Sequence, residues 1–155
     1  MTHYQFITTW YIDQPVEKIW DELIKFEDWP KWWKSIKKVR LEKPKNKKGN
    51  FILHFTWKGI LPYLLTFPIT ITDLEPMKRI EGTAKGDLEG IGICEITSTK
   101  KQTTITYIWD VTTKKKWMNL VAPIAKPVFA WNHNKIMEEG AKGLAKHLGV
   151  TVVHK

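Results

Sequence analysis

His133 is the side chain best suited to acid–base or hydrogen-bond chemistry in this sequence. It lies four residues after Phe129 and four before Met137, so a helix would place all three on one apolar face. An imidazole there could orient a ligand carbonyl or hydroxyl, or act as general acid or base in a cyclisation or dehydration. The alternative is a structural histidine that is hydrogen-bonded to a strand carbonyl.

Four other side chains are candidates for chemistry. Tyr63 and Tyr107 could donate a hydrogen bond to a ligand, although buried tyrosines often donate to the backbone instead. Asp110 falls on the outer face of its strand by alternation, so we discount it. Cys94 is the only cysteine and has no basic neighbour in the sequence, which favours a small buried hydrophobe over a nucleophile.

Metal and cofactor sites find little support in the sequence. One cysteine excludes an intramolecular disulfide and a Cys-based zinc site. The glycines from Gly82 to Gly92 are not followed by a helix, so they do not form a phosphate loop. The histidines show no ligand-type spacing with one another or with carboxylates: His3, His54, His133, His147 and His154. We therefore predict no metal and no cofactor.

The elements that would position these groups begin with a strand at Tyr4–Ile12, which is rich in aromatic and β-branched residues. Pro15 then opens a helix to Phe26, and Asp28 can cap a second short helix through Trp33. Six further strands are predicted at Ile36–Glu42, Asn50–Lys58, Leu64–Leu74, Lys78–Ala84, Leu88–Ser98 and Thr103–Thr113. Turn residues at 48–50, 75–76 and 85–87 separate several of them.

A long helix, Trp117–Leu148, closes the chain, with Pro123 and Pro127 breaking or bending its start and Gly149 ending it. One antiparallel sheet and one long helix must bury their apolar faces against each other. The predicted class is therefore α+β with a helix-grip fold. A curved antiparallel sheet of about seven strands would wrap around the C-terminal helix, with two short helices after the first strand.

Strand alternation predicts an aromatic inner face and a threonine-rich outer face. The chain has nine tryptophans, and small residues such as Gly82, Gly92, Gly140 and Gly143 would lie opposite large ones, which favours a cavity over a filled core. The alternative is an ordinary filled core. The residues predicted to contact a ligand are Phe55, Trp57, Tyr63, Phe67, Ile69, Ile80, Tyr107, Trp109, Phe129, His133 and Met137.

The net charge of +9 is concentrated between Lys31 and Lys58, where nine lysines and Arg40 face the single acid Glu42. A solvated lysine surface without a partner is one interpretation, and an anionic membrane surface, docked by Lys31–Lys48, is another. Nucleic acid is disfavoured because the chain has only two arginines. No secretory signal or bilayer-length apolar run is visible, so we expect a soluble cytoplasmic protein.

Several short patterns occur in a fixed order along the chain: Ile12-Asp13-x-Pro15-x-Glu17-x-x-Trp20, Trp29-Pro30-x-Trp32-Trp33, Gly86-Asp87-Leu88-x-Gly90-x-Gly92, Tyr107-x-Trp109-x-Val111, Ala122-Pro123, and Pro127-Val128-Phe129-x-Trp131-Asn132-His133-x-x-x-Met137-x-x-Gly140-x-x-Gly143-Leu144. Together they resemble the START-like superfamily, also called SRPBCC or birch-pollen-allergen-like. The nearest branch is the bacterial polyketide cyclase/dehydrase and lipid transport group.

The resemblance spans nearly the whole chain and implies one START-like ligand-binding domain over residues 1–155. It implies binding or transport of a hydrophobic small molecule, either a lipid or a polycyclic aromatic polyketide, with a cyclase or dehydratase using the same cavity as the alternative. Whether the protein is an enzyme, and in which oligomeric state it works, are left open by the sequence.

Overall fold

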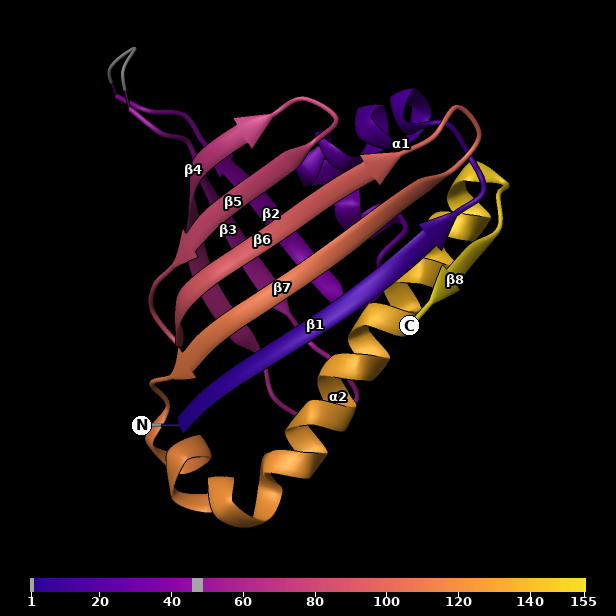
Figure 1. Ribbon diagram of the computed structural model, residues 1–155. Coiled ribbons are helices and arrows are strands. Elements are labelled where there is room, and N and C mark those ends of the chain that lie inside the picture. The colour runs from indigo at the N-terminus through magenta and orange to yellow at the C-terminus, as the bar shows by residue number, and fades with distance from the viewer. Residues whose placement is uncertain (1, 46–48) are drawn as a thin grey trace.

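Alternation of apolar and polar residues produces one antiparallel sheet in the computed structural model, which describes residues 2–45 and 49–155 (Figure 1). The strands of the described chain are β1 Thr2–Ile12, β2 Ile36–Glu42, β3 Ile52–Trp57, β4 Leu65–Glu75, β5 Arg79–Ala84, β6 Leu88–Ser98, β7 Thr103–Thr113 and β8 Val152–His154. They follow the order β2-β3-β4-β5-β6-β7-β1-β8. The α+β helix-grip class is confirmed.

The predicted strands all form, but the sheet has eight strands in the described residues where about seven were predicted. The additional strand is β8, which pairs with the end of β1, Trp10 opposite His154. The first strand pairs with β7 along its full length, from Thr2 opposite Thr113 to Ile12 opposite Thr103. Of the predicted turns, the one at 48–50 includes Lys48, which lies outside the described residues.

Within the described residues, three helices follow the predicted order: α1 Val16–Leu23, the 3-10 helix η1 Phe26–Lys31, and α2 Lys116–Leu148. Pro123 and Pro127 lie inside α2, which bends but does not break there (Figure 1). Each proline lacks one N–H, so the carbonyls of Asn119 and Pro123 lose their helical donors. Gly149 ends α2 with a left-handed backbone, φ 66°.

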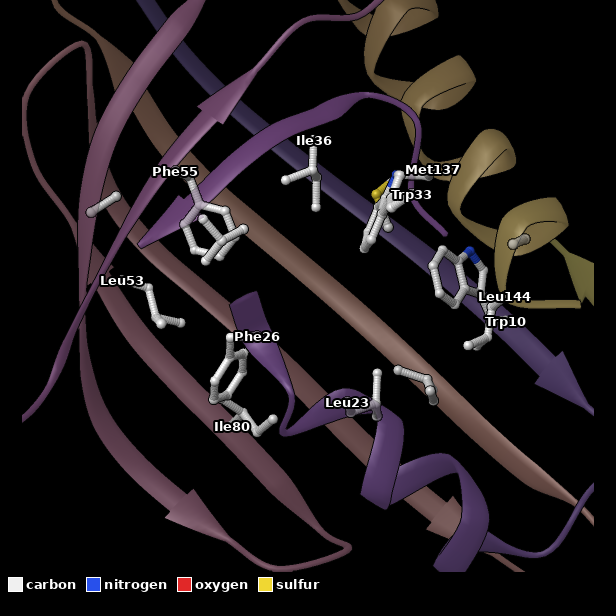
Figure 2. Packing of buried hydrophobic residues seen from close by; sticks show 14 of the residues in the cluster. Trp10, Leu23, Phe26, Trp33, Ile36, Leu53, Phe55, Ile80, Met137 and Leu144 are labelled. Atoms are coloured by element: carbon white, nitrogen blue, oxygen red, sulfur yellow. The ribbon is translucent and has the colours of Figure 1, made fainter. Parts of the chain in front are cut away.

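Side chains from the sheet, from α1 and η1, and from α2 meet in a common interior (Figure 2). Trp10 and Trp33 are fully buried there, with ring centroids 5.2 Å apart. No helix in the described ranges has the combined length and hydropathy that are needed to cross a membrane.

The two helix glycines serve close packing, so the prediction that they leave room in the interior was wrong. A methyl group at Gly140 would overlap the rings of Trp33 and Trp10. One at Gly143 would overlap the backbone carbonyl of Trp32. The space opposite these glycines is already taken by the tryptophans, which draws the segment after η1 tightly against α2.

Candidate functional site

A cavity of about 180 Å³ lies between the concave face of the sheet, the η1 region and α2. Its wall is almost entirely apolar. The lining residues are Phe26, Trp29, Trp33, Leu53, Phe55, Trp57, Leu65, Phe67, Ile69, Ile71, Ile80, Gly82, Leu88, Gly92, Ile93, Cys94, Tyr107, Ile108, Trp109, His133, Ile136 and Met137. Figure 2 shows part of this wall, with Phe26, Leu53, Phe55 and Ile80 on one side and Trp33 and Met137 on the other.

Most of the residues predicted to contact a ligand border this cavity. They are Phe55, Trp57, Phe67, Ile69, Ile80, Tyr107, Trp109, His133 and Met137. Tyr63 and Phe129 are not among the lining residues. They pack instead against each other and against Trp117, with the rings of Tyr63 and Trp117 5.2 Å apart. Any role of these side chains in ligand binding stays a prediction.

Two tryptophans, Trp29 in η1 and Trp33 just after it, form a part of the wall that the prediction of contact residues left out. The indole N–H of Trp33 donates to the carbonyl of Ile136 in α2 at 2.8 Å. The indole N–H of Trp29 donates to the carbonyl of Leu23 at 3.0 Å. The signal that could have found them is the Trp-Pro-x-Trp-Trp pattern itself, since such large side chains between two helices must pack inward. The segment of residues 26–33 is therefore tied to α1 and to α2.

His133 is the most versatile polar group of the wall. Its ring stacks on Phe6 with centroids 4.2 Å apart. Burial, with a smaller contribution from nearby His154, lowers its pKa from 6.5 to about 4, so the imidazole is neutral at pH 7. Within the described residues its ring nitrogens have no hydrogen-bond partner. The hydrogen bond to a strand carbonyl that we expected for a structural histidine is therefore not formed within the described residues.

Tyr107 and Cys94 lie opposite each other on β7 and β6 and are two further polar groups of the wall. Burial raises the pKa of the Cys94 thiol to about 12 and raises that of Tyr107 well above 10. Both groups are therefore protonated and neutral at pH 7. The Tyr107 hydroxyl and the Trp57 indole N–H are buried without a hydrogen-bond partner in the described part of the chain.

No Asp, Glu, Lys or Arg side chain lies among the lining residues within ranges 2–45 and 49–155. Asp110 lies on the outer face, as alternation predicted, where it accepts from His3 Nε2 at 2.5 Å. The same ranges hold no cluster of His, Cys, Asp and Glu able to bind a metal ion. The cavity can offer hydrogen bonds to a neutral molecule, but a charged ligand would lose its hydration without a counter-charge.

The loop of residues 58–64 joins two lining residues, Trp57 and Leu65, and is held to α2 by Asn132. The buried Asn132 Oδ1 accepts hydrogen bonds from the backbone N–H groups of Ile60 at 2.8 Å and Leu61 at 3.3 Å. Gly59 passes so close to this amide that a Cβ there would overlap it. Asn132 therefore holds the loop against α2, together with the packing of Tyr63 on Trp117.

We expect Asn132→Ala to release this loop, because two backbone donors lose their acceptor at a cost of about 1–3 kcal/mol. Hydrogen exchange followed by mass spectrometry should show faster exchange over residues 58–64 and little change in the central strands. The exposed neighbour Asn134→Ala is the matched control. Equal loop protection in both variants would show that Asn132 does not hold the loop.

Comparison with family models gives a match to polyketide cyclase/dehydrase and lipid transport over residues 5–149. No functionally curated protein matches significantly. Among solved structures, a START superfamily protein from Mycobacterium smegmatis is similar with TM-score 0.71 and 18% identity, covering 94% of this chain and 97% of that one.

Two further solved structures have similar folds at low identity. The Zhui aromatase/cyclase from Streptomyces sp. R1128 matches with TM-score 0.64 and 11% identity over 90% of this chain and 94% of that one. The protein TTHA0849 from Thermus thermophilus matches with TM-score 0.70 and 11% identity over 92% of this chain and 99% of that one. At these identities the similarity concerns the fold alone.

Proposed function

The chain belongs to the polyketide cyclase/dehydrase and lipid transport family of the START/SRPBCC superfamily, and we propose that it binds or transports a neutral hydrophobic small molecule in its internal cavity. The observation that carries this proposal is the apolar wall around about 180 Å³ of space. Burying apolar ligand surface there would supply most of the affinity, at roughly 25 cal/mol per Å² before ordering costs.

The size of the cavity indicates which ligands fit without rearrangement. An apolar cavity of about 150 Å³ is enough to bind benzene, so about 180 Å³ suits a molecule of one or two rings. A lipid chain or a polycyclic polyketide would need more space. The loop of residues 58–64 is the segment whose displacement would supply it, since Trp57 and Leu65 flank it.

The polar groups of the wall would orient the ligand. A neutral His133 can donate through one ring nitrogen and accept through the other. Tyr107 can donate to a ligand carbonyl after a small rotation, because its hydroxyl has no acceptor in the described residues. We expect a ligand that is apolar over most of its surface and has one or two hydrogen-bonding atoms.

A cyclase or dehydratase is the second candidate, and the unpaired imidazole of His133 at the cavity wall is the observation that favours it. A pKa of about 4 makes this imidazole a weak base at neutral pH, where general bases work best with a pKa near the operating pH. We therefore place the carrier first. If the protein is an enzyme, His133→Ala should abolish turnover, whereas a carrier should lose only modest affinity.

The test of ligand binding uses the neutral two-ring fluorophore 1-aminonaphthalene, with energy transfer from the tryptophans as the signal. We expect saturable binding by the native protein and at least about tenfold weaker binding by Cys94→Phe, whose benzyl group would occupy the cavity. Thr97→Phe, on the exposed face of β6, is the matched control and should bind normally. Absence of saturable binding by the native protein would overturn the proposal.

Native mass spectrometry of protein purified from its own host would then identify a co-purifying molecule. A neutral, largely apolar species that is present in the native protein and absent from Cys94→Phe would name the ligand class. A charged species held equally by both proteins would contradict the assignment to this cavity.

A further inference from the structure

The first half of α2 exposes a second apolar face that the sheet does not cover. Its members recur at helical spacing and are Trp117, Leu120, Val121, Ile124, Val128 and Trp131. The exposed fraction of Leu120 is 83% and that of Ile124 is 88%. Met118 and Phe129, on the other side of the same turns, are buried. Packing against the sheet therefore explains only one of the two apolar faces of this segment.

The loop of residues 58–64 extends this face. Ile60 and Leu64 are both more than half exposed. The loop lies against the helix, because Ile60 donates to Asn132 at 2.8 Å and the Tyr63 ring packs on Trp117. We call the exposed helix stripe together with Ile60 and Leu64 the docking surface. It lies at the end of the molecule where the first turns of α2 project past the sheet (Figure 1).

The charged residues of the two segments that form the docking surface are lysines, and the neighbouring acids Asp87 and Glu89 are paired with Lys115 and Lys114. The sequence has no Asp or Glu between residues 43 and 72 or between 111 and 137, the two segments that form it. Lys58, Lys116 and Lys126 are exposed and have no carboxylate partner among the described residues, although Lys126 lies 5.4 Å from the centre of the Tyr4 ring. Each can meet an anionic group.

We propose that the docking surface binds an anionic lipid bilayer, with α2 lying in the interface. Exposed apolar side chains that include tryptophans, flanked by lysines, are the composition of helices that lie on membranes. A second copy of the chain fits less well, because apposed docking surfaces would bring Lys58, Lys116 and Lys126 of the two copies together, and the segments that carry them contain no acid. The exposed apolar side chains and the lysines without carboxylate partners thus both favour an anionic bilayer.

The docking surface differs from the basic segment Lys31–Lys48 that was first considered for membrane contact. Between residues 31 and 45 the structure has exposed lysines but no exposed large apolar side chain, and residues 46–48 lie outside the described residues. Charge alone holds a protein weakly and is screened by salt, whereas apolar insertion is not. Of these two regions, only the docking surface combines lysines with exposed apolar side chains.

The test is co-sedimentation with large vesicles of phosphatidylcholine containing about one third phosphatidylglycerol, and with phosphatidylcholine alone. We expect the native protein to bind the anionic vesicles and the double variant Leu120→Gln/Ile124→Gln to partition at least about tenfold less. The control is Ile7→Gln/Ile91→Gln, which removes two exposed apolar side chains from the sheet, 63% and 43% exposed. It should bind like the native protein.

Three results would overturn this proposal. They are absence of binding to anionic vesicles, equal loss of binding in both double variants, and a dimer seen by light scattering that Leu120→Gln/Ile124→Gln dissociates. Fluorophore binding in the cavity is measured on the same variants without vesicles. Because Leu120 and Ile124 do not line the cavity, fluorophore binding should be unchanged in their double variant. This measurement separates the docking surface from the proposed ligand site.

Discussion

Gly143→Ala should destabilise the protein by about 3 kcal/mol or more, the upper range for inserting a methyl group into a packed interior. In an exposed helix the same substitution stabilises by about 1 kcal/mol, because alanine is the better helix former. Here the new methyl group would overlap the backbone carbonyl of Trp32. A backbone atom cannot move aside as a side chain can, so the segment after η1 would have to separate from α2.

Urea unfolding monitored by tryptophan fluorescence measures this loss. Gly140→Ala should cost less, because the neighbouring atoms are the rings of Trp33 and Trp10, which can shift. Lys146→Ala, on the exposed side of the same helix, should change stability by less than about 0.5 kcal/mol. If Gly143→Ala were as stable as Lys146→Ala, the close approach of Trp32 to α2 would be wrong.

Elements with a long periodic pattern could be predicted from the sequence almost to the residue. Strands β2, β6 and β7 begin and end where alternation placed them. Strand β8 could not be predicted, because three residues carry no measurable period and its existence depends on the free edge of β1. Its pairing is a property of the finished sheet, which the local pattern does not encode.

The strand residues that line the candidate site could be predicted from the sequence, but the shape of the cavity could not. Strand alternation assigned Phe55, Phe67 and Trp109 to the inner face, and all three border the cavity. On α2 the periodic stripe correctly included His133 and Met137 among inward residues, but it treated the helix as straight. Pro123 and Pro127 bend α2, so Phe129 packs beneath the loop of residues 58–64 instead. Which segment packs against a given helix face depends on residues that are distant in sequence.

The cavity and the docking surface share one structural connection. The loop of residues 58–64 carries Ile60 and Leu64 of the docking surface, and its two neighbours Trp57 and Leu65 border the cavity. Asn132 is its anchor to the helix that carries both features. If the loop were inserted in a bilayer, the path between cavity and membrane would avoid water, and an apolar ligand would exchange without a hydrated intermediate.

Acidification should destabilise the native protein through His133. Its pKa falls from 6.5 in an ordinary environment to about 4 in the fold, so the unfolded chain takes up a proton before the folded one does. Above pH 6.5 the imidazole is neutral in both states and contributes no pH dependence. Between pH 6.5 and about 4 the unfolded state gains from protonation, and the free energy of unfolding falls by about 3 kcal/mol.

The comparison of native protein with His133→Gln isolates this contribution, since carboxylates and other histidines titrate in both proteins. The groups that act on His133 are Phe6, which stacks on it, and His154, whose own neighbours are Glu138 and Lys135. We expect urea unfolding between about pH 7.5 and pH 4.5 to show a smaller loss of stability for His133→Gln by about 2–3 kcal/mol. Parallel pH profiles would mean that His133 takes up its proton as readily in the fold as in the unfolded chain, and the lowered pKa that follows from its burial would be wrong.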